Sequence, residues 1–225
     1  MVPADAQNGT DVNHRDRTRV LFERIADQRS GEYHRTVVSR LSQRRVRSVV
    51  MRFVGRSLDA VTAPRVLDAG CGLGDSSRAV AGRYPMAEVL GVDFSPGTIA
   101  LAQSRALPSV RFACGELTTL PVVDRWAHLT ICVNTLHHVQ PSEQRRALEE
   151  LARVTGQDLI VEIKNADSLY FKRHSKRVEG VPITPTTSGA VSGVLADRGF
   201  DLRRTWRFLG VGWLSPLEVL WFRRG

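Results

Sequence analysis

Residues Val66 to Ser77 read VLDAGCGLGDSS, and this stretch decides the fold of the chain. It begins as a buried apolar strand, turns through three alternate glycines and continues into a helix. Glycines are needed where the backbone takes a positive φ or lies close to a ligand. A strand, a glycine turn and a helix N-terminus together form a nucleotide-binding corner in α/β proteins. We therefore expect a mostly parallel sheet with a ligand at the end of this strand.

The glycine spacing and the flanking acids indicate which kind of nucleotide fits. A dinucleotide fingerprint reads G-x-G-x-x-G, and its helix N-terminus holds a pyrophosphate. Here the spacing is G-x-G-x-G, with Asp68 before the turn and Asp75 after it. Two carboxylates repel a pyrophosphate and favour a ligand that carries positive charge.

The stretch resembles motif I of the class I S-adenosylmethionine (SAM)-dependent methyltransferases, which reads E/D-x-G-x-G-x-G. SAM carries an ammonium and a sulfonium, so acids around the turn are electrostatically favourable. The resemblance implies that the first acid and the turn bind the methionine part of SAM. These residues are Asp68, Gly70, Cys71, Gly72 and Gly74. Because glycine turns occur in many folds, the resemblance depends on the residues that follow.

A second predicted strand, residues 88–93, ends in an acid, Asp93. A strand-terminal acid about 20 residues past the glycine turn accepts hydrogen bonds from ribose hydroxyls. We therefore expect Asp93 to bind the ribose. By resemblance, Phe94 packs on the adenine of SAM and Ser95 caps the next helix beside it. The alternative for Asp93 alone is an N-cap or loop carboxylate.

The third predicted strand, residues 110–114, leads into Gly115, Glu116 and Leu117. In the family this place usually reads G-D-A, and its acid hydrogen-bonds the adenine amino group. The resemblance implies that role for Glu116, and it makes the backbone N–H of Leu117 the partner of adenine N1.

The fourth predicted strand, residues 127–133, is followed by NTLHH at residues 134–138. This segment resembles the small-molecule methyltransferases typified by the quinone-biosynthesis enzymes, where a polar residue and then Leu-His-His follow the strand. The resemblance implies that Asn134 lies beside the methyl-transfer centre. The chain lacks the Asn/Asp-Pro-Pro-Tyr/Phe motif of adenine methylation and the Pro-Cys nucleophile of cytosine C5 methylation. Both absences argue against an enzyme that methylates nucleic-acid bases.

His137 and His138 are candidates for contact with the acceptor. A histidine pKa near neutrality lets the imidazole take a proton from a hydroxyl or enol nucleophile. His137 is the better candidate for this general base, and His138 is expected to bind the substrate. The alternative is that one imidazole packs under the fourth strand and hydrogen-bonds to the backbone.

A cationic, aromatic segment follows the fifth predicted strand, residues 157–163. Loops past the carboxyl ends of the strands form the ligand crevice in this kind of fold. Tyr170, Lys172 and Arg173 are therefore expected to bind an anionic substrate such as a phosphate or a carboxylate. The alternative is a solvated helix face.

The N-terminal part of the chain divides into two predicted regions. Residues 1–15 are polar without a period and are expected to be disordered. Residues 16–62 carry apolar side chains at intervals of three and four, which predicts a helical cap over the core domain, residues 63–225. Tyr33 stands where related enzymes often carry a tyrosine near the cofactor or substrate, and the alternative is a half-buried helix tyrosine.

Composition bounds the class of protein. The chain has 225 residues, 42% of them hydrophobic, and a formal net charge of +9. It shows neither a signal peptide nor an apolar run long enough for a transmembrane helix. Its three cysteines have no metal-ligand spacing, so we expect no metal and free thiols in a reducing cytoplasm. The arginine-rich N-terminal part could attract nucleic acid, an anionic membrane surface or a phosphorylated substrate, although arginine replaces lysine almost everywhere.

These observations predict one fold and rank three functions. We expect an α/β, Rossmann-like, seven-stranded and mostly parallel sheet with an antiparallel last strand, helices on both faces and an N-terminal helical cap. The resemblance implies a methyltransferase that uses SAM and a small-molecule acceptor, which is anionic, lipid-like or a secondary metabolite. The alternatives are a methyltransferase of RNA or another macromolecule, and a SAM-binding protein without turnover.

Overall fold

The structure, a computed structural model, describes Val20 and residues 37–173, 177–178 and 181–225. Three predictions fall partly or wholly outside these residues. They are the disorder of residues 1–15, the first part of the cap, and the role of Tyr33. The division of the chain at residues 62 and 63 stays a prediction.

A seven-stranded sheet forms the centre of the molecule, in the order β3-β2-β1-β4-β5-β9-β8. Its strands are β1 (Arg65–Ala69), β2 (Glu88–Asp93), β3 (Val110–Cys114), β4 (Ala127–Cys132), β5 (Thr155–Lys164), β8 (Phe200–Arg207) and β9 (Leu217–Arg224). The first five pair in parallel, and β9 runs antiparallel to both β5 and β8. The predicted sheet and its antiparallel last strand are confirmed.

The strand order reverses between β1 and β4, because the chain leaves β1 toward β2 and returns on the other side. In open α/β sheets such a reversal opens a crevice at the carboxyl ends of the strands, where ligands bind. The glycine turn after β1 lies at this point. We call this side of the sheet the carboxyl edge and the opposite side the amino edge.

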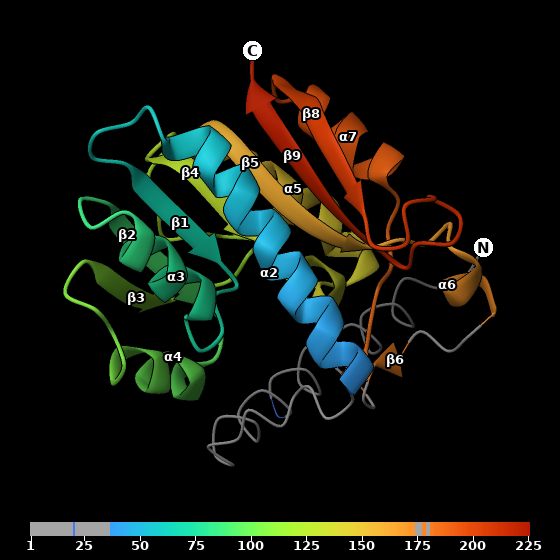
Figure 1. Ribbon diagram of the computed structural model, residues 1–225, viewed down its shortest axis with the longest axis horizontal. Coiled ribbons are helices and arrows are strands. Elements are labelled where there is room, and N and C mark those ends of the chain that lie inside the picture. Colours follow the sequence, from blue (N-terminus) through green and yellow to red (C-terminus); the bar gives the residue numbers. More distant parts are fainter. Residues whose placement is uncertain (1–19, 21–36, 174–176, 179–180) are drawn as a thin grey trace, which may run out of the picture.

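Helices cover both faces of the sheet (Figure 1). One face carries α2 (Val37–Leu58), α3 (Asp75–Arg83) and α4 (Pro96–Gln103), whose apolar side chains share one buried cluster. The other face carries α5 (Pro141–Val154) and α7 (Ser188–Ala196) in a second cluster. Neighbouring strand residues divide between the two, as Val66 and Leu67 do, which explains the nearly continuous apolar runs in the central strands.

The helix α2 is bound to the sheet by its apolar side. Val46, Val50 and Val54 are buried, and the ring of Phe53 stacks on Trp221 of β9 at 5.6 Å between centroids. Its other side is lined with exposed arginines. Within the described residues, no helix is long and apolar enough to cross a bilayer.

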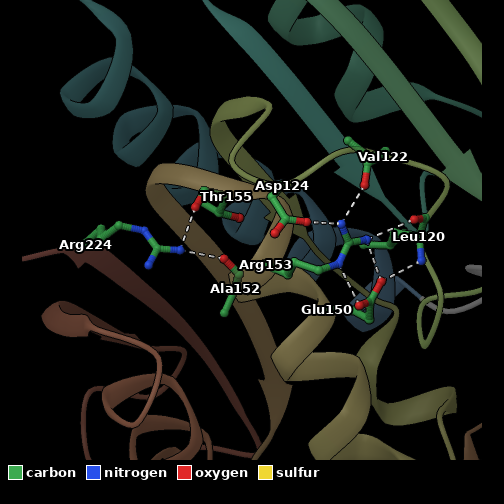
Figure 2. A network of polar contacts seen from close by, with 8 residues as sticks. All are labelled: Leu120, Val122, Asp124, Glu150, Ala152, Arg153, Thr155 and Arg224. Carbon is green, nitrogen blue, oxygen red and sulfur yellow. Dashed lines mark hydrogen bonds and ion pairs between the residues drawn. The ribbon is translucent and has the colours of Figure 1, made fainter.

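Two arginines hold the amino edge, Arg153 by binding the loop before β4 and Arg224 by binding helix ends (Figure 2). Arg153, in the last turn of α5, contacts Glu150, Asp124 and the backbone before β4. Arg224, in β9, donates to the carbonyls of Ala152, Thr155 and Arg198 at the ends of α5 and α7. A cation at a helix C-terminus is favourable because the unpaired carbonyls there carry partial negative charge.

Candidate functional site

The glycine turn is closely packed at its ends and open in its middle. Gly70, Gly72 and Gly74 have φ of 78°, 52° and 77°. A Cβ on Gly70 would lie 2.1 Å from the Thr135 side chain, and one on Gly74 would lie 2.4 Å from Phe112. A Cβ on Gly72 would meet no atom within 4 Å. The backbone at Gly72 therefore faces space that a ligand can fill.

Asp93 is fixed in place by the backbone around it. Its Oδ2 accepts the Gly72 N–H at 2.9 Å, and its Oδ1 accepts the Ser95 N–H at 3.1 Å. Each carboxylate oxygen has a second lone pair, so the group can still accept hydrogen bonds from ligand hydroxyls. Burial raises the pKa of Asp93, and the nearby Glu116 carboxylate raises it further.

The predicted cap at Ser95 is confirmed. Its Oγ accepts the Thr98 N–H at 3.2 Å and begins α4. The Ser95 side chain is therefore committed to the helix, and Phe94, which is half-buried, is the next side chain toward the site. The Cys71 thiol beneath the turn is buried, and burial raises its pKa.

Asp68 lies beneath the turn and faces α3. Its Oδ2 accepts the Ser77 hydroxyl at 2.6 Å. Burial raises the pKa of Asp68 to about 6, and the carboxylates of Asp93 and Asp75 contribute to the rise. The carboxylates at this turn thus repel one another, and a cation bound among them would relieve the repulsion.

The segment after β3 joins the same edge. The Gly115 N–H donates to the Asp93 carbonyl at 2.9 Å, which brings the third strand end to the second. The Glu116 side chain is exposed, whereas the Leu117 side chain is buried in the cluster on the α5 face. Only the backbone of Leu117 can therefore be offered to a ligand, and its contact with adenine N1 stays a prediction.

Asn134, at the end of β4, connects this strand to β5 and α2. Its backbone has a positive φ of 57°. Its N–H donates to Glu162 Oε2 at 3.0 Å, and its side-chain Nδ2 donates to Gln43 Oε1 of α2 at 2.6 Å. Lys164 Nζ donates to Glu162 Oε1 at 2.6 Å and to Asn134 Oδ1 at 3.4 Å.

Three residues of this network were not predicted from the sequence: Gln43, Glu162 and Lys164. Nor was Thr135, whose hydroxyl donates to the Gly70 carbonyl of the turn at 3.1 Å. One signal was available. The Glu162 side chain is fully buried between the apolar residues Val161 and Ile163, and a buried carboxylate requires a partner.

His137 is enclosed and uncharged. Its side chain is 4% exposed, and its ring centroid lies 4.2 Å from that of His138. Burial, His138 and Lys164 together hold the pKa of His137 well below its usual range. Among the described residues its Nδ1 has no hydrogen-bond partner. The imidazole is therefore neutral at pH 7, the form that can accept a proton.

Tyr170, Lys172 and Arg173 form a group apart from the turn. They lie in or at the end of the short helix α6 (Leu169–Arg173), and their side chains are exposed. The Leu169 N–H donates to the Trp213 carbonyl at 2.8 Å, so α6 is attached to the loop between β8 and β9.

The donor set at this edge fits one kind of ligand. Three interacting carboxylates, a turn that is open at Gly72 and the free backbone of Leu117 suit a molecule with hydroxyls, a base and a positive charge. Among the described residues, no group of three or more His, Cys, Asp or Glu side chains could hold a metal ion.

Comparison with known proteins agrees with this geometry. Residues 66–158 match the family model described as a methyltransferase domain. The trans-aconitate 2-methyltransferase of Methylobacterium nodulans is 46% identical over 123 residues, which are 52% of this chain and 45% of that protein. The ubiquinone/menaquinone biosynthesis C-methyltransferase of Syntrophotalea carbinolica is 30% identical over 151 residues, 64% of this chain and 60% of that protein. The chain thus spans less than two thirds of the length of these relatives.

A solved structure shares the fold over most of both chains. Magnesium protoporphyrin IX methyltransferase from Synechocystis PCC 6803, solved with bound SAH, superposes with a TM-score of 0.68 at 22% identity. The match covers 84% of this chain and 88% of that one.

Proposed function

We propose that this chain, whose residues 66–158 match a methyltransferase domain, is a class I SAM-dependent methyltransferase that methylates a small-molecule acceptor. One observation carries the proposal. The Asp93 carboxylate is held by the Gly72 and Ser95 N–H groups directly beside the open face of the glycine turn. This is the arrangement that a ribose at the carboxyl end of β2 requires.

Each predicted cofactor residue has a task in this proposal. Asp93 accepts the ribose hydroxyls, Glu116 and the Leu117 N–H bind the adenine, and Phe94 packs against it. Asp68 and the turn supply negative potential and backbone groups to the methionine part, with Asn134 at its far end. When bound, SAM supplies an electrophilic methyl group.

The chain contributes alignment and exclusion of water. Holding two reactants in line supplies a large part of the acceleration of such transfers, so a catalytic acid or base is not required. Asn134 suits this task because contacts from α2 and β5 fix its position at the end of β4. His137 is the candidate base where the acceptor needs one, because its neutral form can take a proton, but its lowered pKa makes it a weak base.

Lys164 favours an anionic acceptor. Its ammonium lies at the end of β5, 3.4 Å from Asn134 Oδ1, and it is paired with the buried Glu162. A carboxylate or phosphate on the acceptor would find a cation there. The relatives named above act on small molecules, which supports the same class of acceptor for this chain.

Calorimetric titration with S-adenosylhomocysteine (SAH) tests the cofactor site. We expect Asp93→Ala to weaken SAH binding at least about tenfold, about 1.4 kcal/mol, through the lost ribose hydrogen bonds. Asp201→Ala, which removes an exposed carboxylate on β8, is the matched control and should bind as the wild type does. Unchanged affinity in the Asp93 variant would remove this residue from the site.

The exposed arginines of α2, among them Arg44, Arg47 and Arg52, support the second candidate, a methyltransferase of RNA. Transfer of labelled methyl groups to bulk RNA, falling steeply with salt, would favour it. A protein that binds SAM without turnover predicts SAH binding but no SAH formation with any metabolite extract.

A further inference from the structure

The loop between β8 and β9 displays four large apolar side chains to solvent. Leu209, Val211, Trp213 and Leu214 are 53%, 46%, 56% and 39% exposed. Single exposed apolar residues are ordinary on protein surfaces, but four within six positions gather apolar surface on one loop, and such a concentration marks an interaction site. We call these four residues the β8–β9 patch.

Hydrogen bonds fix the backbone of this loop, so the patch has a defined position on the surface. The Asn165 Nδ2 donates to the Gly212 carbonyl at 2.8 Å, and the Leu169 N–H donates to the Trp213 carbonyl at 2.8 Å. The Ser215 N–H donates to the Val211 carbonyl at 2.9 Å. These bonds fix the loop against β5 and α6 while its apolar side chains point away from the core.

Cations from three elements surround the patch. Arg45 of α2 lies 5.9 Å from the ring centroid of Phe208, at the start of the loop. Arg207 contacts the loop at Gly212 and pairs with Glu218. Lys172 and Arg173 are exposed on α6, the helix that the loop binds. The acidic residues in this region are Glu218, which is buried, and Asp167.

The patch lies on the same edge of the sheet as the glycine turn. Since β8 is antiparallel to β9, and β9 is antiparallel to β5, β8 runs in the direction of the parallel strands. The end of β8 and the loop after it therefore belong to the carboxyl edge, beside α6 (Figure 1). The patch thus faces the side from which an acceptor enters.

We propose that the β8–β9 patch docks on an anionic lipid bilayer. Tryptophan and leucine side chains insert at the level of the headgroups, while arginine and lysine bind the lipid phosphates and extend their stems along the apolar surface. A second copy of this chain would oppose cation to cation across the same surface, and nucleic acid would leave the apolar side chains uncovered. Docking would turn the acceptor side of the site toward the membrane.

Co-sedimentation with vesicles tests the docking surface without any methyl acceptor. Full-length protein is mixed at low salt with phosphatidylcholine vesicles, or with vesicles that contain about 30% phosphatidylglycerol. We expect binding to the anionic vesicles that falls with rising salt, together with a blue shift of tryptophan emission.

Two pairs of variants separate the apolar and the cationic contributions. Trp213→Ser should weaken vesicle binding at least about tenfold and abolish the blue shift, whereas Met86→Ser, at a still more exposed apolar residue of the amino edge, should change neither. Lys172→Gln with Arg173→Gln should weaken binding to anionic vesicles about tenfold. Arg56→Gln with Arg105→Gln, two exposed arginines of the amino edge, is the matched control.

Three results would overturn the proposal. They are the absence of binding to anionic vesicles, equal binding by the Trp213 and Met86 variants, and loss of self-association or RNA binding in the patch variants while vesicle binding persists. Because SAH affinity is measured separately, failure of the docking surface leaves the proposed methyltransferase site untouched.

Discussion

At the amino edge of the sheet, all five N–H groups of the Arg153 guanidinium donate hydrogen bonds. At the carboxyl edge, by contrast, carboxylates of like charge lie close together and one buried imidazole nitrogen has no hydrogen-bond partner among the described residues. Arg153 bonds to Glu150, to Asp124 and to the carbonyls of Leu120 and Val122. The Asp93 and Asp75 carboxylates help to raise the pKa of Asp68, Glu116 helps to raise that of Asp93, and the Nδ1 of His137 has no partner among the described residues.

The difference shows which edge serves stability and which serves binding. At the amino edge Arg153 and Arg224 are paired with opposite charges, backbone carbonyls or helix ends, as on a purely structural surface. The carboxyl edge gathers like charges and positive φ values, which are unfavourable unless a ligand uses them. Removal of a charge at the amino edge should therefore lower stability and leave SAH affinity unchanged. Removal of a charge at the carboxyl edge should raise stability and lower SAH affinity.

Removal of the Arg153 side chain is expected to have the largest effect on stability. Arg153→Ala leaves two backbone carbonyls and the Glu150 carboxylate without their donor, and should lower the free energy of unfolding by about 3 kcal/mol. Urea unfolding followed by circular dichroism measures this loss. Arg105→Ala, an exposed arginine after α4, is the control and should stay within about 0.5 kcal/mol of the wild type. SAH affinity of the folded Arg153 variant should be unchanged.

Neutralisation of Asp68 is expected to stabilise the protein. Its pKa of about 6 lies above the ordinary value of 3.8, so the unfolded chain loses this proton first and stability falls as the pH rises between these values. Above about pH 6 the whole penalty, on the order of 3 kcal/mol, is present. Asp68→Asn should remove most of it, a gain of about 2 kcal/mol at pH 7.5.

The pH dependence distinguishes this electrostatic gain from a packing effect. Below about pH 4 both the folded and the unfolded carboxyl are protonated, so the stabilisation by Asp68→Asn should vanish there. Thermal unfolding at pH 7.5 and pH 4 measures the difference, and SAH affinity should fall at the same time. A gain that is equal at both pH values would contradict the assigned cause.

The carboxyl edge was the more predictable of the two, because its signals are local in sequence. The acid, glycine turn and helix lie within twelve residues, and Ser95 binds a backbone group only three positions away. The strand order followed from the resemblance that these motifs carry. Gln43 and Asn134 could not be paired in advance, since 91 positions separate them and the contact exists only because α2 packs across the sheet.

Residues whose partners come from distant elements escaped prediction at both edges. From the sequence alone, Arg153 is an ordinary cation on a helix and Asp124 an acid in a loop. Their ion pair is evident only in the structure, where the backbone before β4 lies beside α5. Lys164 likewise looks, from the sequence, like an ordinary polar residue at the end of a strand, and its contacts with Glu162 and Asn134 are not predicted. Of these distant contacts, only that of Glu162 is indicated by the sequence, because a charged residue between apolar residues of a buried strand requires a partner.

An added methyl group at Gly72 should affect binding more than folding. Gly72→Ala places a Cβ in open space but requires a side chain at φ 52°, so it should lower stability by about 1 kcal/mol. Because that space is where the cofactor is proposed to lie, SAH affinity should fall about tenfold. Gly82→Ala, in α3 with open space around it, is the matched control and should leave affinity unchanged. Wild-type affinity in the Gly72 variant would move the cofactor elsewhere.

The smallest effect is expected at His137. Its imidazole is enclosed and its pKa lies well below the usual range, so it is a weak base and carries no charge between pH 6 and 8. His137→Gln keeps a neutral polar group of similar size, and the rate of SAH formation should change by less than about fivefold, below about 1 kcal/mol. For the same reason the wild-type rate should show no histidine titration over this pH range. A loss of about 100-fold at unchanged SAH affinity would instead make His137 the base, because general bases contribute factors of that size.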